Sequence, residues 1–292
     1  MLTSLIAIGL GLLGLVLGSF AGASVWRLRA RQLKDDKKAG EEVDKKEYAK
    51  LAKLLKHTVM KDRSQCLHCG YELTWRDLVP LFSWLSLGGR CRECRKPIGY
   101  FEPIIELGVA AYFILSFVLW PVTLVGFIPC FIFALWLIGG VLMAMLFAYD
   151  AKWLLLPDRI NYALIGIGVV TAVLTIAIDP KPFDALLGIL GGLLILSGTY
   201  LLLYIISNGR WIGFGDIKLG AGLALLIADW RIALMALFFA NLIGTLIVIP
   251  MLATKRMKRN SHLPFGPLLI AGAILAKFVG LMIVDLYLFS VY

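Results

Sequence analysis

Charged side chains are scarce in this sequence. Of its 292 residues, 16% are charged and 60% are hydrophobic, and the mean hydropathy is +0.85. Soluble globular domains carry roughly 25% charged residues. The shortage of charge therefore excludes a soluble fold, and we expect much of the chain to contact membrane lipid.

Basic residues are absent before Arg27. A secretory signal peptide needs a positively charged region ahead of its apolar core, so we expect the apolar stretch at residues 3–26 to stay in the protein as a membrane span. Gly9 to Gly14 matches the GxGxxG pattern of dinucleotide-binding folds, but it follows no predicted strand and lies inside this span. Gly14 and Gly18 instead predict the close packing of another helix.

Apolar stretches recur along the whole chain, with gaps too short for separate globular domains. A helix needs about 20 apolar residues to cross roughly 30 Å of hydrocarbon. The sequence therefore predicts an all-α polytopic membrane protein with about eight transmembrane helices. We expect them at residues 3–26, 103–120, 123–149, 160–178, 184–206, 217–229, 231–253 and 264–291.

The net charge of +10 is concentrated between the first two predicted spans and near residues 255–259. This distribution follows the positive-inside rule and argues against a nucleic-acid partner. It predicts an external N-terminus and a multi-pass protein of the inner (plasma) membrane. The parts expected on the cytoplasmic side are residues 27–102 and the loops Asp150–Asp158, Ser207–Asp216 and Lys255–Arg259, and the loop Asp179–Asp184 is expected outside.

A charged segment, residues 34–63, opens the predicted cytoplasmic region. Within it Leu51, Leu54 and Leu55 recur at helical spacing beside lysines. One interpretation is a solvated helix or linker. The other is a basic amphipathic helix that binds anionic lipid headgroups.

Cysteine is sparse, but four of the five cysteines form two CxxC pairs. Cys66 and Cys69 are separated from Cys91 and Cys94 by 21 residues. Two such pairs typically supply four thiolates to one tetrahedral zinc ion, and four protein ligands leave no position for water, so the predicted role is structural. Two disulfides are the alternative, which a reducing cytoplasm disfavours.

Three residues near these motifs have less specific interpretations. Gly70 follows the first CxxC pair and suits a tight turn. His68 lies between two cysteines and is expected to face solvent rather than to bind the metal. Cys130, the fifth cysteine, falls inside a predicted span and is expected to be a small core residue.

Three aspartates stand at the ends of predicted spans: Asp150, Asp158 and Asp216. Ionisable groups at membrane depth are costly, so each requires a reason. Asp158 and Asp216 each open a span, so either can be a helix N-cap. Asp150 ends a span, where the helix dipole disfavours an anion, and capping does not explain it.

The predicted topology puts Asp150 and Asp216 on the same side of the membrane. Two carboxylates a few ångströms apart do not ionise together readily, and such a pair can hold a water between a base and an acid for attack on a peptide carbonyl. Gly213 and Gly215 either allow close approach of a substrate backbone or form a flexible turn. Lys218 is placed to offset part of the negative charge.

These motifs resemble those of the type IV prepilin peptidase family, the bifunctional leader peptidases and N-methyltransferases of pilus and type II secretion systems. The resemblance covers nearly the whole chain. It rests on Gly18-Ser-Phe20 with Arg27, on the CxxC pairs with Trp75–Trp84 between them, on Asp150 with Leu156-Pro-Asp158, and on Gly213-Phe-Gly-Asp-Ile-Lys218.

The resemblance implies that Asp150 and Asp216 are catalytic and that Asp158 supports the site without being essential. It also implies pilin-like precursors as substrates, cleaved after a glycine between a short basic leader and a hydrophobic helix. On this basis the chain divides into a first transmembrane helix at 1–26, a cytoplasmic insert with the zinc site at 27–102, and a transmembrane aspartic peptidase domain at 103–292.

The family also transfers a methyl group from S-adenosylmethionine to the new N-terminus. Two departures fall in the region associated with that activity: Ala21-Gly-Ala23 stands where the family usually has an asparagine, and the segment 34–63 is longer than usual. Glu106 is the candidate for orienting the substrate amine. A structural partnership with an arginine is the alternative for Glu106.

Two other functions compete with proteolysis. A proton-coupled transporter would use the aspartates as a relay, and it predicts titratable groups near mid-bilayer and repeated broken helices. The predicted spans instead place the aspartates at span ends, and no convincing internal repeat is found. A non-catalytic zinc-knuckle scaffold of a secretion or pilus system predicts that loss of zinc alone accounts for all lost function.

Overall fold

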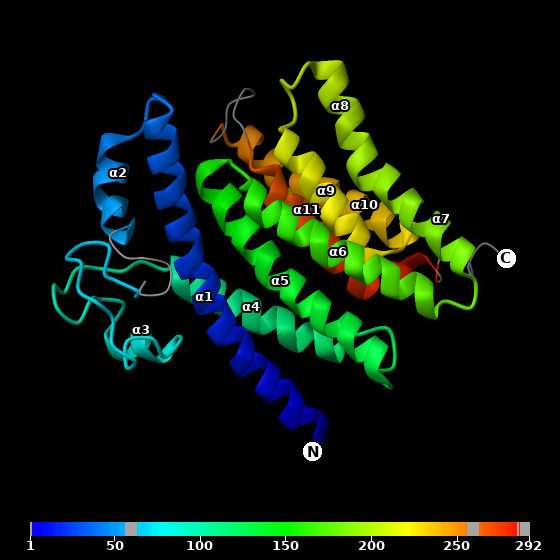
Figure 1. Ribbon diagram of the computed structural model, residues 1–292, viewed down its shortest axis with the longest axis horizontal. Coiled ribbons are helices and arrows are strands. Elements are labelled where there is room, and N and C mark those ends of the chain that lie inside the picture. The colour runs from blue at the N-terminus through cyan, green and yellow to red at the C-terminus, as the bar shows by residue number, and fades with distance from the viewer. Residues whose placement is uncertain (1, 56–62, 256–262, 285, 287–292) are drawn as a thin grey trace. The chain divides into compact units, whose positions relative to one another are not determined.

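The computed structural model describes residues 2–55, 63–255, 263–284 and 286. All regular elements in this part of the chain are helices, and β-pairing is limited to two isolated bridges. The helices, labelled along the chain in Figure 1, divide between two compact units, residues 1–118 (unit 1) and 119–292 (unit 2). The all-α fold that the sequence predicts is confirmed.

Seven helices in the described residues are long and apolar enough to cross a membrane. They are Leu2–Lys38, Phe101–Val118, Phe127–Trp153, Asp158–Ile178, Pro182–Ser207, Trp230–Ala253 and Phe265–Val284. The additional span expected at 217–229 is the 14-residue helix α9 (Phe214–Ile227), whose length of about 21 Å falls short of a full crossing. It ends at Ala228, which has a left-handed backbone (φ 56°), and Asp229 then caps the next helix.

Unit 1 is built on two helices that pack along each other, α1 (Leu2–Lys38) and α4 (Phe101–Val118). A Cβ atom on Gly14 would lie 2.7 Å from the Cα of Ala110, and one on Gly18 would lie 2.7 Å from the Cα of Glu106. Only glycine allows the two backbones to come this close. The helix contact predicted from Gly14 and Gly18 is confirmed.

The helix α1 continues well beyond the apolar stretch that ends at residue 26. Its 37 residues span about 55 Å, which exceeds the hydrocarbon thickness of roughly 30 Å. The charged segment then turns back through α2 (Lys45–Leu51) and the short 3₁₀ helix η1 (Ala52–Leu55). Ala30 and Leu33 of α1 form a small buried cluster with Leu51 and Leu54.

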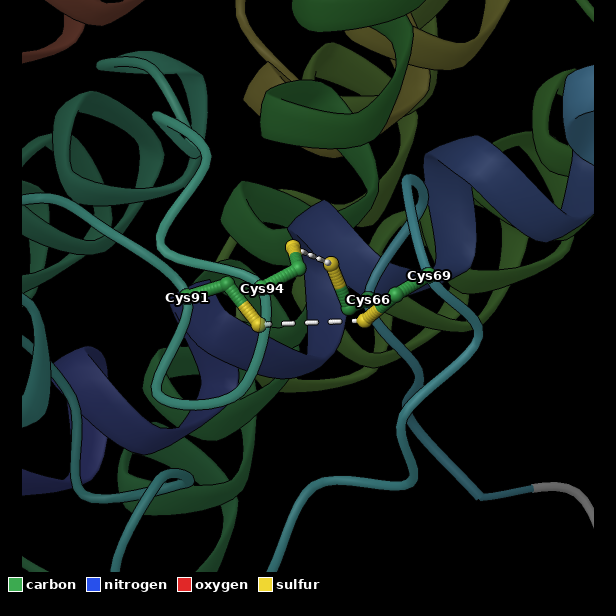
Figure 2. Close-up of side chains that lie close together, drawn as sticks. All are labelled: Cys66, Cys69, Cys91 and Cys94. Atoms are coloured by element: carbon green, nitrogen blue, oxygen red, sulfur yellow. Dashed lines mark hydrogen bonds between the residues drawn. The ribbon is translucent and has the colours of Figure 1, made fainter.

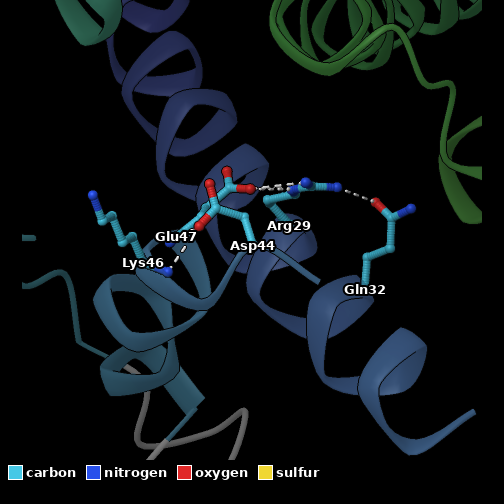
Figure 3. A network of polar contacts seen from close by, with 5 residues as sticks. All are labelled: Arg29, Gln32, Asp44, Lys46 and Glu47. Carbon is cyan, nitrogen blue, oxygen red and sulfur yellow. Dashed lines mark hydrogen bonds and ion pairs between the residues drawn. The ribbon is translucent and has the colours of Figure 1, made fainter. Parts of the chain in front are cut away.

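Polar contacts hold the N-terminus of α2 in place and join it to α1, as Figure 3 shows. Asp44 accepts hydrogen bonds from the backbone N–H groups of Lys46 and Glu47 and so caps α2. Arg29 of α1 forms an ion pair with Glu47 at 2.8 Å. The segment therefore contains a helix with one face packed against α1 and an exposed outer face, in agreement with the solvated-helix interpretation. Binding to anionic headgroups stays a prediction, and residues 56–62 of the predicted segment lie outside the described residues.

Unit 2 contains α5 (Phe127–Trp153), α6 (Asp158–Ile178), α7 (Pro182–Leu193), the π-helical turn η3 (Leu194–Gly198), α8 (Thr199–Ser207), α9, α10 (Trp230–Ala253), α11 (Phe265–Leu275) and the π-helical turn η4 (Ala276–Gly280). The helix α9 packs mainly against α6 and also contacts η3, α7, α8, α10 and α11. Because protein surrounds it, its length does not have to match the bilayer.

Small residues again allow close packing between α6 and α9. A Cβ atom on Gly168 would lie 2.7 Å from the Cβ of Leu225, and one on Gly222 would lie 3.0 Å from the Cγ of Leu164. The helices α7, η3 and α8 form one continuous apolar helix with a π-turn in the middle. The ends of α5, α9 and α11 carry the candidate site.

We expect the substitution Gly18→Leu to destabilise unit 1 by about 1–3 kcal/mol, because the larger side chain must push α4 away from α1. The matched control is Gly9→Leu in the same helix, where a Cβ atom meets nothing within 4 Å. Thermal unfolding of both variants in detergent would test this. Equal melting temperatures for the two variants would contradict the packing argument.

Candidate functional site

Asp150 lies in the last turn of α5 and is buried, with 5% of its surface exposed. Its carboxylate oxygen Oδ2 accepts a hydrogen bond from the backbone N–H of Gly266 at 2.9 Å. Gly266 belongs to the first turn of α11, whose N–H groups have no partner within that helix. Asp150 therefore caps a different helix from its own, an explanation that its position in the sequence does not suggest.

Asp216 lies in the first turn of α9 and is partly buried. Its Oδ2 atom accepts a hydrogen bond from the backbone N–H of Gly213, the N-cap residue, at 3.2 Å. The predicted N-cap role of Asp216 is wrong, because Gly213 occupies that position and Asp216, three residues later, accepts the backbone N–H of the cap residue. The two aspartates, 66 positions apart in the sequence, lie in neighbouring parts of unit 2, because Leu156 packs beside both Gly215, which precedes Asp216, and Gly266, which binds Asp150.

Leu156 separates and positions the loops around both aspartates. A Cβ atom on Gly266 would lie 3.3 Å from Leu156 Cδ2 and 2.8 Å from Asp150 Oδ2. A Cβ atom on Gly215 would lie 2.9 Å from the Cβ of Leu156. Gly215 and Gly266 therefore have to be glycine because a leucine side chain and a carboxylate occupy the space beside them.

Asp158, the first residue of α6, forms an ion pair with Lys218 of α9 at 2.7 Å. The ammonium group of Lys218 also lies 5.0 Å from the ring centres of both Tyr162 and Phe214. The charge that Lys218 was expected to offset is thus that of Asp158. Pro157, rather than Asp158, occupies the N-cap position of α6.

Asn161 is a site residue that the sequence interpretation missed. It is fully buried in α6, and its Nδ2 atom donates a hydrogen bond to the carbonyl oxygen of Gly215 at 3.4 Å. The contact holds the turn before Asp216 against α6. A signal was present, because an asparagine three positions after Asp158 is a polar group inside a predicted span.

The four cysteines of the CxxC pairs converge, as Figure 2 shows. Their sulfur atoms all lie within 4.8 Å of one another; Cys66 and Cys94 are 3.9 Å apart, and Cys69 and Cys91 are 4.0 Å apart. A tetrahedral zinc with Zn–S bonds of about 2.3 Å requires S···S distances of about 3.8 Å. The cluster therefore has the dimensions of a four-thiolate metal site, and all four cysteines are free thiols rather than disulfides.

Each CxxC pair sits in the same kind of turn. The first pair is bracketed by the bridge Gln65↔Glu72 and the second by Arg90↔Pro97. Each turn ends at a residue with a left-handed backbone conformation, Gly70 (φ 80°) in the first and Arg95 (φ 57°) in the second. The tight turn expected at Gly70 is confirmed. Both turns aim their sulfur atoms at one point, and the exposed His68 is not part of the cluster, as predicted.

Asp77 joins the loop between the cysteine pairs to the second pair. It accepts hydrogen bonds from the Thr74 hydroxyl at 2.7 Å and from Arg92 Nε at 2.8 Å. Burial opposes the charge of Asp77, but these bonds outweigh it and hold its pKa below the usual value. Asp77 is therefore an ionised carboxylate at neutral pH. It stabilises the second knuckle, which is the turn that carries Cys91 and Cys94.

Cys130 is exposed, so its expected role as a core residue is wrong. It lies in the first turn of α5, and its sulfur atom contacts the carbonyl oxygen of Leu124 at 3.7 Å. The buried face of α5 begins at Phe133, after this residue.

Glu106 is buried in α4 and binds the loop that precedes α3 (Phe82–Ser86). Its Oε2 atom accepts a hydrogen bond from the backbone N–H of Leu81 at 2.8 Å, and the Ser19 hydroxyl also bonds to it. These partners are a backbone amide and a hydroxyl rather than the arginine considered from the sequence. A direct role for Glu106 in methyl transfer stays a prediction.

Comparison with known proteins divides the chain in the same order as its motifs. Residues 12–120 match the model of the bacterial peptidase A24 N-terminal domain, and residues 137–249 match that of the type IV leader peptidase family. The four cysteines of the CxxC pairs and Glu106 fall in the first match, and Asp150 and Asp216 fall in the second. No solved structure matches the chain.

Curated relatives extend the match over most of the sequence. The prepilin leader peptidase/N-methyltransferase of Pseudomonas aeruginosa is 30% identical over 95% of this chain and 91% of its own length. The type 4 prepilin-like proteins leader peptide-processing enzyme of Escherichia coli O78:H11 is 30% identical over 89% of each chain. A prepilin leader peptidase/N-methyltransferase of Aeromonas hydrophila is 31% identical over 74% of this chain and 71% of its own. This chain therefore belongs to the type IV leader peptidase family.

Proposed function

We propose that this chain is a multi-pass membrane aspartic endopeptidase that cleaves the leader from pilin-like precursors after a glycine. The observation that carries the proposal is the convergence of Asp150 and Asp216 at the ends of different helices, where each carboxylate accepts a backbone N–H. Membership of the leader peptidase family supports the same reaction.

The pair supports hydrolysis by general acid and base catalysis. With one carboxylate ionised and the other protonated, the ionised group takes a proton from a water whose oxygen bonds to the peptide carbonyl carbon, and the protonated group gives its proton to the carbonyl oxygen. The resulting diol then collapses. The C–N bond breaks, the nitrogen takes a proton from the pair, a diol hydroxyl returns one, and the aspartates again share one proton.

We propose that this site faces the cytoplasm. The basic residues that follow the apolar part of α1, Arg27, Arg29 and Arg31, support a cytoplasmic position for the insert through the positive-inside rule. Lys255 gives the same orientation to the end of α10, while residues 256–259 lie outside the described residues. A precursor with a basic leader and an apolar helix would present its cleavage point at this membrane face.

We propose that the Cys66, Cys69, Cys91 and Cys94 cluster binds one structural zinc ion. The sulfur distances and the four-thiolate set fit zinc, and four protein ligands leave no place for a reacting water. When bound, the metal would hold the two knuckles together. The metal would take no part in hydrolysis.

We also propose that the enzyme methylates the new N-terminus with S-adenosylmethionine as the methyl donor. The names of the relatives, which include N-methyltransferase, support this. The carboxylate of Glu106, the candidate for orienting the amine, accepts hydrogen bonds from the backbone N–H of Leu81 and from the Ser19 hydroxyl. No observation favours the transporter or the scaffold.

Replacing Asp150 or Asp216 by asparagine should lower cleavage of a pilin-like precursor by at least about a thousandfold, because the shared proton of the pair is lost. Asp158→Asn should keep most of the activity, since that residue pairs with Lys218 outside the reacting pair. The matched control is Asp184→Asn, a change at an exposed aspartate that should leave cleavage unaffected. Full activity in the Asp150 or Asp216 variant, measured by gel shift of the precursor, would rule out the mechanism.

Cys69→Ser should lose the bound zinc and lower the melting temperature, because three thiolates hold the ion less well and the knuckles separate. Cys130→Ser should retain about one zinc per chain, since this cysteine lies outside the cluster. Elemental analysis and thermal unfolding test both variants. A Cys69→Ser protein that loses zinc and keeps its thermal stability would contradict a structural role.

Mass spectrometry of the mature substrate separates the two activities. Co-expression with the wild-type chain should give a pilin N-terminus that starts after the leader glycine and carries one added methyl group. With Asp216→Asn, the precursor should stay uncleaved. Cleavage without the methyl mass would show that this chain is a peptidase alone.

A further inference from the structure

Tyr200 is a buried tyrosine whose hydroxyl has no partner. Its side chain is 3% exposed, and among the described residues no group forms a hydrogen bond with its oxygen atom. A buried hydroxyl without a partner is costly in free energy and is rare in native proteins. Such a group is explained when a ligand supplies the missing hydrogen bond.

The hydroxyl lies on a helix face that is directed at the aspartate pair. Ser197, three positions earlier, donates a hydrogen bond to the carbonyl oxygen of Ile217 at 3.1 Å, and Ile217 directly follows Asp216. Tyr204, one turn later, contacts the ring of Phe214 with ring centres 5.8 Å apart. Residues three and four apart share a helix face, so Tyr200 faces the first turn of α9.

A second contact places Tyr200 beside the other half of the site. Its ring meets the ring of Phe265 edge to face, with centres 5.1 Å apart. Phe265 directly precedes Gly266, whose N–H binds Asp150. Tyr200 thus lies between the element that carries Asp216 and the element that holds Asp150, and Asp216 acts on it electrostatically.

One other buried side-chain atom in the described residues of unit 2 has no partner. This is Oδ1 of Asn161, whose Nδ2 atom holds the carbonyl of Gly215. Both unused polar atoms therefore border the turn that carries Asp216. A polar ligand bound beside this turn would supply the partner that each atom lacks.

We propose that Tyr200 is a further catalytic residue, whose hydroxyl donates a hydrogen bond to the oxygen of the substrate peptide carbonyl. The inference rests on the proposed peptidase function. A phenol carries its proton at neutral pH and is a donor. As water adds to the carbonyl carbon, the oxygen gains negative charge, so the hydrogen bond strengthens in the transition state.

The test is steady-state cleavage of a full-length pilin-like precursor by the detergent-solubilised full chain. Tyr200→Phe keeps the ring against Phe265 and removes only the hydroxyl. It should lower kcat by about 100-fold with little change in KM or melting temperature. Tyr204→Phe, one turn away on the same face, is the matched control and should keep the wild-type kcat.

Three further outcomes decide between this proposal and the one on which it rests. If the wild type cleaves and Asp216→Asn does not, a Tyr200→Phe protein with wild-type kcat overturns the role of Tyr200 and leaves the peptidase intact. A loss of activity that only follows a lowered melting temperature also overturns it. Failure of the wild type to cleave the precursor overturns both.

Discussion

The hydrogen bond from the backbone N–H of Gly266 to the carboxylate of Asp150 is the contact on which the site depends. The first-turn N–H groups of α11 have no acceptor within the helix, and Asp150 supplies one for Gly266. The carboxylate also lies at the positive end of the α11 dipole. Both groups are buried, so water does not compete for them. The bond therefore fixes where the end of α5 meets the start of α11.

Steric contacts set the remaining distances around that bond. Leu156 packs against the glycine positions 215 and 266, so the loop after α5 controls how closely α9 and α11 approach. Asn161 holds the turn before Asp216, and Asp158 ties α6 to α9 through Lys218. Helix ends are thus positioned by side chains from neighbouring helices, which leaves the two carboxylates facing one site.

Unit 1 is stabilised by different means. Its two long helices pack through glycines, and the hairpin of α1 with α2 buries a cluster of four small or aliphatic side chains. The cysteine region has few buried apolar residues, since Gly89 and Cys91 are the two buried residues between 63 and 100 in the described chain. A segment with so little core depends on cross-links for a defined shape, which is the physical reason for four converging thiols.

Local pattern predicted much of this protein. The apolar runs, the CxxC spacing and the small residues of the first span each act over a short stretch of chain, so each pattern indicates its own structural consequence directly. Hydropathy was less informative about which apolar runs cross the membrane. The apolar run after Asp216 forms a short helix enclosed by protein, and hydropathy alone does not distinguish such a helix from one that faces lipid.

By itself, the sequence determined the all-α membrane fold, the four-thiolate cluster and the contact at Gly14 and Gly18, and it predicted Asp150 and Asp216 as the carboxylates of the site. Only the tertiary structure decided what those groups touch: Asp150 caps α11, Lys218 pairs with Asp158, and Leu156 requires glycine at positions 215 and 266. The reason is physical. Composition and periodicity act within one helix, whereas these contacts join helices far apart in the chain, and their partners exist only once the helices have packed.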